Sequence, residues 1–420
     1  MSFNLSVQTE SVNNKNFRDC MDYFTEQKLS ARSAVFDREW EKAAAASLGK
    51  YTKSVNPAEG VSGESVLNLE QKQSIARSLV HGRLDQCGRV LLSTVNGEMR
   101  KASHGKLEVQ IKKSETGKFF FSGLMHCGNV WSCPECASKI TEARRNELSP
   151  AVASWIDQGH GVSLLTLTVP HLVKDSCKEI TDGILKAYKT MLNRKAYKRV
   201  SKEIGERGRI RTLEVTYGSN GWHTHLHILL FTEKPIDEKI LALKKELLSY
   251  WQSACVSSGL GLPNSHGLDL VNGSQAAAYI SKWGLVEEMT KGHLKKGKKQ
   301  GQVSPFGLLE LYAQGDKKAG YRFKEFVEAF KGKRQLVYTK GLKELLGLNS
   351  DKTDQEIVDS EDLKAEVFVN IPFYYWEIIT RHNLKTECLN QCEKGLESFR
   401  DWLASIGGLD EDVCSPHTWG

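Results

Sequence analysis

The amino-acid sequence predicts an α+β fold built around an antiparallel sheet, with a small metal-binding module preceding the sheet in the chain. Two observations carry this prediction. Segments with strand and helix periodicity alternate between residues 161 and 290. Three closely spaced cysteines lie between residues 127 and 136, before the first of these strands.

The chain begins with a polar, poorly patterned segment, residues 1–65, which we interpret as a variable or partly disordered leader. Residues 66–160 follow. They contain the helical segment LEQKQSIARSLVHGRL, the hairpin-like strands LEVQIKK and KFFFSGLM, the cysteines, and the helical segment ASKITEARRNELSPAVASWI. We expect this part to be a small module tied together by a metal ion.

Residues 161–290 have the clearest pattern. The segments are the strand GVSLLTLTV, the helix KEITDGILKAYKTMLNRKAYKRVSKEI, the strand RIRTLEVTY, the turn GSNG, the strand WHTHLHILLF, the helix DEKILALKKELLSYWQSAC, the strand HGLDLV and the helix GSQAAAYISKWG. The first six elements have the order of the split βαβ unit. This order predicts a ferredoxin- or RRM-like antiparallel sheet with helices packed on one face.

Residues 291–420 predict a C-terminal accessory region that mixes helices with the apolar stretch VFVNIPFYYWEII. The aromatic residues FYYW could stack on bases. Core or interface packing is the interpretation that we favour for them. We expect this region to bind DNA or another partner.

The charge is unevenly distributed. The whole chain carries a net charge of +7, whereas residues 101–340 carry 38 Lys and Arg against 23 Asp and Glu, a net charge of +15. A basic middle indicates a polyanionic partner such as nucleic acid, although a solvated basic face without a partner is the alternative. No apolar run reaches the roughly 18 residues of a membrane helix, and the first 30 residues lack the pattern of a signal peptide. We therefore expect a soluble, cytoplasmic protein without a membrane partner.

The strand GWHTHLHILLF places histidines at every second position, His223, His225 and His227, on one face. If the four-residue turn GSNG closes a hairpin, Tyr217 lies opposite Trp222 and Glu214 lies opposite His225. Two imidazoles and a carboxylate on one face suit a divalent ion such as Mn²⁺ or Mg²⁺ that leaves positions for a phosphate oxygen. The register depends on the turn length, and a slip of one residue would remove Glu214 from this face.

His223 has the same parity but lies nearer the turn, and it is the weaker ligand candidate. We expect it either to orient the ligands or to contact DNA.

The helix SQAAAYISKWG places Tyr279 and Lys282 on one face, three residues apart. A tyrosine beside a metal-bound phosphate can attack it and form a phosphotyrosyl bond. A lysine one turn away can lower the phenol's pKa or stabilise developing negative charge. The motif Y-x-x-K alone also fits an ordinary amphipathic helix, and its position after the last predicted strand favours the catalytic interpretation.

The cysteines predict a structural zinc site. The segment HCGNVWSCPECA spaces Cys127, Cys133 and Cys136 as C-x5-C-x2-C, and CPEC has the form of a zinc knuckle. Cys87, in the turn CGR, is the expected fourth ligand, and His126 is the alternative. Disulfides are not expected in a reducing compartment.

Together these motifs resemble the HUH endonucleases, named for two histidines separated by an apolar residue, here His225-Leu226-His227. The chain is most similar to the zinc-containing rolling-circle replication initiators of small plasmids and some phages. LLTLTVPH, GWHTHLHILL and AAYISKW stand in the places of the three family motifs, and SPFGLLELYAQGD and CGR also resemble family segments.

The resemblance implies that residues 161–290 form the HUH endonuclease domain and residues 66–160 the zinc-binding module. It implies that Tyr279 nicks one strand at an origin, keeps the 5′ phosphate and frees a 3′ hydroxyl that primes synthesis. The expected partners are single-stranded and origin DNA, a host helicase and a DNA polymerase. One position departs from the family, because Gln275 replaces a glutamate that activates water for termination. Glu287, Glu288 or a second transesterification are the alternatives for that step.

Two further functions remain open. A single-strand transposase or a mobilisation relaxase would share the same chemistry. A non-catalytic zinc-ribbon protein on an RRM-like sheet would bind nucleic acid without cutting it, but such sheets usually display aromatic side chains on the binding face.

Overall fold

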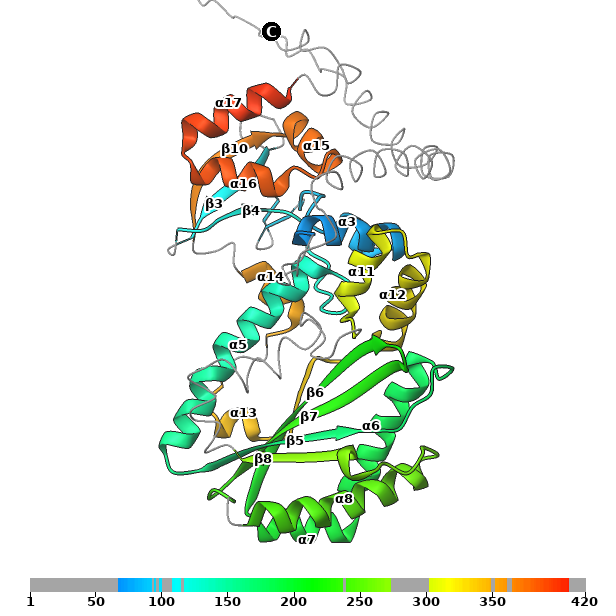
Figure 1. Ribbon diagram of the computed structural model, residues 1–420. Coiled ribbons are helices and arrows are strands. Elements are labelled where there is room, and N and C mark those ends of the chain that lie inside the picture. The colour runs from blue at the N-terminus through cyan, green and yellow to red at the C-terminus, as the bar shows by residue number, and fades with distance from the viewer. Residues whose placement is uncertain are drawn as a thin grey trace, which may run out of the picture. The chain divides into compact units, whose positions relative to one another are not determined.

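The computed structural model describes residues 67–92, 94–95, 98–99, 108–114, 117–236, 239–272, 302–348, 352–360 and 365–407. They all belong to one of the two units into which the chain divides, Val66–Gly420. They form a mixed α+β structure with antiparallel sheets, as the sequence predicted (Figure 1). The predicted leader and the segment that contains Tyr279 and Lys282 lie outside the described residues.

The largest sheet in the described part of the chain has five strands in the order β8-β5-β7-β6-β9, and every neighbouring pair is antiparallel. The strands are β5 (Gly161–Thr168), β6 (Glu206–Gly218), β7 (Gly221–Thr232), β8 (Leu268–Asn272) and β9 (Leu336–Tyr338). The connecting helices are α6 (Cys177–Asn193), α7 (Lys195–Glu203), α8 (Ile240–Ser257) and the short η3 (Ser265–Gly267). The predicted order of strands and helices is confirmed as far as Asn272. One helix differs: it is interrupted at Arg194, whose extended backbone separates α6 from α7.

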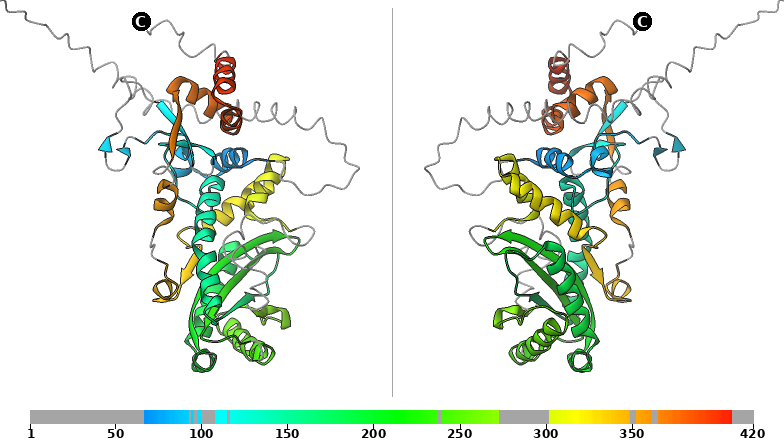
Figure 2. Two further views of the ribbon diagram at one scale, coloured as in Figure 1. Left: turned by 90° about the vertical axis from the view of Figure 1, so that its left-hand side faces the viewer. Right: turned by 90° about the vertical axis from the view of Figure 1, so that its right-hand side faces the viewer.

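The two faces of this sheet are covered differently (Figures 1 and 2). Side chains such as Leu165, Leu213 and Leu226 pack on one face against α6 and α8 in the main core. The other face is apolar at one end, where helix α5 (Pro134–Asp157) packs against Leu229 and Phe231. The sequence did not predict that α5 covers this second face. The histidines of β7 occupy its other end.

Helices α11 (Pro305–Ala313) and α12 (Lys317–Phe330) extend the main core and contact α3 (Leu69–Leu79). The chain then adds β9 to the edge of the five-stranded sheet, beside β6. Two short helices follow, α13 (Leu342–Leu345) and α14 (Asp354–Ser360).

A second sheet has the order β10-β3-β4 and joins distant parts of the chain. Its strands are β3 (Glu108–Lys113), β4 (Phe119–Ser122) and β10 (Glu366–Pro372), and its core includes α15 (Phe373–Arg381), α16 (Lys385–Glu393) and α17 (Leu396–Ile406). The remaining short elements are α4 (Arg83–Gln86), β1 (Thr94–Val95) and β2 (Glu98–Met99). Trp376, in the stretch FYYW, is buried and its Nε1 donates to the carbonyl of Arg89 at 2.7 Å, as core packing requires. None of the described helices is long and apolar enough to cross a membrane.

Candidate functional site

The three histidines lie on β7, which pairs with β6 through the turn GSNG. Tyr217 lies opposite Trp222 and Glu214 lies opposite His225, so the register predicted from the turn length is confirmed. Gly221 is the last residue of this turn and has a φ of +85°, which a glycine adopts without strain. The hairpin therefore brings Glu214 and His225 to the same face of the sheet.

The polar face around these residues continues onto β5. Thr168 lies opposite His225, and Thr166 lies opposite His227. Thr212 of β6 lies opposite His227 on its other side. Polar side chains from three adjacent strands therefore surround the histidines at the end of the face that α5 leaves uncovered.

His227 is buried and is held from two sides. Its Nε2 lies 2.8 Å from Oε2 of Glu214, and its Nδ1 lies 3.1 Å from Oγ1 of Thr166. The side chain of His227 is 7% exposed and that of Glu214 is 11% exposed. Because a carboxylate only accepts hydrogen bonds, Nε2 donates to Glu214 in this arrangement, and Nδ1 accepts from the hydroxyl of Thr166. A metal ion held by both side chains would take the place of the Nε2 proton, and Nδ1 would then donate to Thr166.

His225 has a different environment. Its ring stacks on that of His227, with centroids 5.9 Å apart and planes inclined by 15°. Its Nδ1 is buried, and no described atom forms a hydrogen bond with it. Burial, together with the neighbouring His223, lowers the pKa of His225 to about 3. The imidazole is therefore neutral at neutral pH and keeps a lone pair available for a metal ion.

The row of imidazoles continues beyond these two. The His223 ring centroid lies 4.0 Å from that of His225, and the His171 centroid lies 5.0 Å from that of His223. His171 is oriented by a 3.0 Å contact between its Nδ1 and the carbonyl of Asn220. His171 ends the segment LLTLTVPH, and no role was predicted for it. Its place just after β5, beside the hairpin turn, is the signal that could have identified it.

The donor set of Glu214, His225 and His227 fits a divalent metal ion, because two imidazoles and a carboxylate share one face and one buried nitrogen has no partner among the described atoms. The fit is looser than in a closed site. In the described part of the chain, the only group of three or more candidate ligands whose atoms all lie within 4.8 Å of one another is a set of cysteines. Glu214, His225 and His227 are therefore not gathered into one compact group of ligand atoms among the described residues.

The predicted nucleophile cannot be placed against this face. Tyr279 and Lys282 follow β8 in the chain and lie outside the described residues. Gln275 and the two alternative glutamates, Glu287 and Glu288, lie outside them too.

Four buried cysteines form the second candidate site. Cys87 ends α4, Cys127 lies in the loop after β4, Cys133 caps the N-terminus of α5, and Cys136 lies in the first turn of α5. Their four sulfurs lie within 4.8 Å of one another. The structure thus brings Cys87 to the other three, whereas His126 is not a member of this group.

The sulfur spacing suits tetrahedral coordination. Cys87 Sγ lies 3.7 Å from the sulfur of Cys133 and 3.5 Å from that of Cys136, and the sulfurs of Cys127 and Cys136 are 3.7 Å apart. Four thiolates at about 2.3 Å from a zinc ion lie about 3.8 Å from one another. A disulfide would require about 2.05 Å. The cluster could therefore bind zinc.

The surroundings of the cluster favour negative charge on the sulfur of Cys87, whereas burial raises the pKa of Cys133. The amide of Gln73, in α3, donates to Cys87 Sγ at 3.5 Å and to Cys133 Sγ at 3.3 Å. Hydrogen bonds from the other thiols, the largest effect coming from Cys127, hold the pKa of Cys87 well below its usual value. Gln73 is buried and was not predicted, because nothing in its local sequence distinguishes it from other helix residues.

Most of the chain is similar in sequence to known proteins. The family model described as Replication protein matches residues 125–383. Protein rep of Streptomyces lividans is 26% identical over 362 residues, which cover 68% of this chain and 79% of that protein. Neomycin resistance protein of Streptomyces cyanogenus is 31% identical over 133 residues, which cover 26% of this chain and 30% of that protein. No solved structure matches the chain. Since the family model spans more than half of the chain, the protein belongs to the replication protein family.

Proposed function

We propose that this protein is a rolling-circle replication initiator of the HUH type, which nicks and rejoins one strand of origin DNA in a metal-dependent reaction. Membership of the replication protein family supports the role. The observation that carries the chemistry is the face formed by Glu214, His225 and His227, on which the buried Nδ1 of His225 has no hydrogen-bond partner among the described atoms.

The topology supports the same assignment. Strands β5, β6, β7 and β8 with helices α6 and α8 follow the order strand, helix, strand, strand, helix, strand. In space the four strands are ordered β8-β5-β7-β6. This is the arrangement expected of a ferredoxin-like sheet, and β9 extends it at one edge.

In this proposal Glu214, His225 and His227 hold Mn²⁺ or Mg²⁺, with Thr166 fixing the ring of His227. The ion supplies Lewis acidity toward a phosphate oxygen when it is bound. Glu214, His225 and His227 bind the ion, and Thr166 orients the ring of His227. His225 contributes as a neutral imidazole. Side chains on three adjacent strands of one sheet are rigidly spaced, which suits a site that must hold a phosphate in one position.

The nucleophile in this proposal is Tyr279. Its phenolic oxygen forms a bond to the phosphorus while the bond from phosphorus to the 3′ oxygen breaks, and the phenol proton is lost to solvent or a base. The released 3′ oxygen takes up a proton and becomes the hydroxyl that primes synthesis. Lys282 offsets the charge that develops on the phosphorane. Attack by a 3′ hydroxyl on the phosphotyrosine reverses these steps and rejoins the strand.

The remaining parts are assigned accordingly. Residues 66–160 contribute a structural zinc site through Cys87, Cys127, Cys133 and Cys136. Residues 291–420 contribute contacts to DNA or to a partner. In the cytoplasm, a host DNA polymerase would extend the freed 3′ end while a host helicase unwinds the duplex.

The test is incubation of the full chain with the DNA that encodes it and Mn²⁺, followed by a denaturing gel. The wild-type protein is expected to yield a covalent protein–DNA species. Tyr279→Phe is expected to abolish this species and keep DNA binding, because only the attacking oxygen is lost. Tyr321→Phe is the matched control, since Tyr321 is 70% exposed on α12 and far in the chain from the proposed site.

An adduct that persists in Tyr279→Phe would disprove the assignment of the nucleophile. Binding without cleavage by the wild-type protein, with each of Mn²⁺ and Mg²⁺, would favour the zinc-ribbon binding protein instead.

A further inference from the structure

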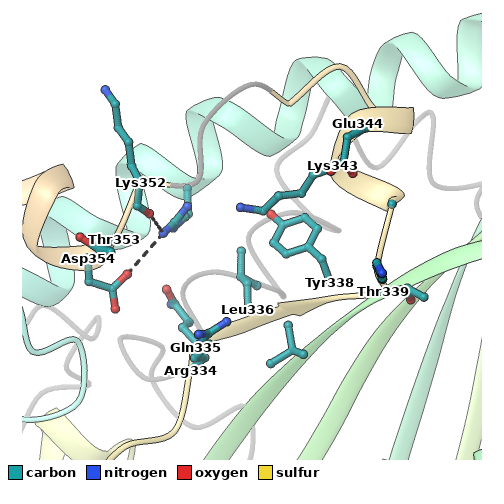
Figure 3. Close-up of a pocket in the computed structure, with 14 residues that line it drawn as sticks. Arg334, Gln335, Leu336, Tyr338, Thr339, Lys343, Glu344, Lys352, Thr353 and Asp354 are labelled. Atoms are coloured by element: carbon teal, nitrogen blue, oxygen red, sulfur yellow. Dashed lines mark hydrogen bonds and ion pairs between the residues drawn. The ribbon is translucent and has the colours of Figure 1, made fainter.

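A cavity of about 580 Å³ opens at the outer edge of the five-stranded sheet (Figure 3). Strand β9 and the residues on either side of it form one wall, and α13 forms another. Arg144 of α5 and residues 352–354 line the remaining side. Neither sequence motifs nor the proposed cleavage chemistry accounts for this cavity.

The lining is strongly basic. It contains five cationic side chains, Arg144, Arg334, Lys340, Lys343 and Lys352, against two carboxylates, Glu344 and Asp354. The guanidinium of Arg144 is largely neutralised, because it lies 3.5 Å from Asp354 and 3.4 Å from Glu147.

Three of the cations are available to a ligand. Arg334, Lys340 and Lys352 are exposed, and no carboxylate of the described residues lies within ion-pair distance of their side chains. A concave surface with uncompensated cations attracts phosphate groups.

An aromatic ring stands among these charges. Figure 3 shows Tyr338 projecting from β9 beside Lys343, whose Nζ lies 5.1 Å from the ring centroid. Burial raises the pKa of Tyr338 to about 12, so the phenol is neutral and does not repel an anion. Proteins that bind single-stranded nucleic acid combine aromatic rings, on which bases stack, with cations that pair with phosphates.

The cavity lies on the same face of the sheet as the histidines. Leu336 of β9 is opposite Thr212 of β6, and Thr212 is opposite His227 of β7. Directly opposed residues share a face, and two strand spacings amount to about 10 Å. Leu336 in the cavity wall and His227 therefore lie about 10 Å apart across one face of the sheet.

We propose that this cavity binds the backbone of single-stranded DNA beside the cleavage site, with phosphates at Arg334, Lys340 and Lys352 and a base against Tyr338. The choice of ligand rests on the proposed nicking function. Single-stranded DNA is favoured over a free nucleotide because Arg334 and Lys340 flank β9 at the edge of the sheet, and Leu336 of β9 shares a face with His227.

The test compares two double variants of the full chain. Lys340→Ala/Lys352→Ala removes two exposed cavity lysines. Lys198→Ala/Lys202→Ala removes two exposed lysines of α7, a helix connecting β5 to β6 that does not line the cavity. Fluorescence anisotropy measures the affinity of each protein for an oligothymidylate of about 30 nucleotides, longer than a typical single-strand site, over a series of salt concentrations.

The cavity variant is expected to bind the oligonucleotide roughly tenfold more weakly near physiological salt. The slope of log affinity against log salt concentration is expected to fall in magnitude by about 1.4, which is about 0.7 for each phosphate that the variant no longer neutralises. The α7 variant is expected to keep the wild-type slope. Equal slopes in the two variants would overturn the proposal. Displacement of the oligonucleotide from the wild-type protein by thymidine monophosphate at the same phosphate concentration would also overturn it, in favour of a mononucleotide site.

This outcome is separable from that of the nicking proposal. Oligothymidylate binding needs no origin sequence and no cleavage. The absence of a Tyr279 adduct would therefore refute the nicking chemistry, whereas the binding measurement would still test whether the cavity binds single-stranded DNA.

Discussion

The three histidines of β7 share a face but differ in their surroundings. His227 is buried and bonded to both Glu214 and Thr166. His225 stacks on it and has a buried nitrogen without a partner among the described atoms. His223 lies at the outer end of the row, beside His171. Alternation and turn length were enough to predict which histidines pair with Glu214, whereas the bond to Thr166 required the pairing of β5 with β7.

At the residue scale, Thr166→Val tests the proposed orientation of His227. The substitution removes the 3.1 Å contact to Nδ1, and loss of such a partner typically weakens metal binding by about 10- to 100-fold. A titration of Mn²⁺ against cleavage and against direct Mn²⁺ binding measures the effect.

Thr212→Val is the matched control. Thr212 also lies opposite His227, on the other neighbouring strand, and is buried. It makes no hydrogen bond to the imidazole in the described residues. Equal Mn²⁺ affinities in the two variants would mean that Thr166 does not position the ring.

At the scale of elements, the hairpin of β6 and β7 follows from local chemistry, since a four-residue turn and period-two alternation set its register. Strands β9 and β10 are different. Both lie at the edge of a sheet. The three residues LVY of β9 are too few to show an alternation that distinguishes a strand from a loop. The helix predicted after β5 ends early because Arg194 adopts an extended backbone, which composition alone did not indicate.

The geometry of this hairpin can be tested at Gly221. Gly221→Ala is expected to destabilise the protein by about 1–3 kcal/mol, since a non-glycine residue at this φ of +85° is strained. The added Cβ would also lie 3.0 Å from the Cα of Val173. Thermal unfolding measures the loss of stability. The salt dependence of DNA binding tests whether the loop that contains Val173 is displaced.

Gly332→Ala separates the effect of backbone strain from that of the close approach to Val173. Gly332 has a φ of +74°, and a Cβ there would meet nothing within 4 Å. A loss of stability as large as that of Gly221→Ala would show that backbone strain alone accounts for the effect and that the close approach to Val173 contributes nothing.

At the scale of the whole molecule, distant segments complete each substructure. Residues 366–372 form the strand that pairs with β3, about 250 residues earlier in the chain. The cysteine cluster joins the end of α4 to the start of α5, and Gln73 ties α3 to it. If the cluster binds a metal ion, the stability of this part is expected to depend on it.

The whole-molecule prediction concerns zinc. The purified chain is expected to carry about one zinc ion, as a four-cysteine site requires, and Cys87→Ser is expected to lower this content and the unfolding temperature. Removal by a chelator should have the same effect, because the ion binds the folded state and not the unfolded one. Elemental analysis and thermal unfolding measure the two effects.

Cys255→Ser is the control for this change. Cys255 is equally buried in α8 but lies outside the cluster, so the zinc content is expected to stay the same. A chelated protein that keeps its metal-loaded unfolding temperature would contradict a structural role for the ion.

The sequence by itself determined the α+β class, the order of elements from β5 to β8, the register of the histidine hairpin and the spacing of three cysteines. These depend on periodicity, turn length and short spacings, which act between near neighbours in the chain. The tertiary structure alone decided that α5 covers one end of the histidine face, that Thr166 and Gln73 contact the two candidate sites, and that β9 lines a basic cavity. Each of those contacts joins residues far apart in the chain, and long-range packing leaves no local pattern in the sequence.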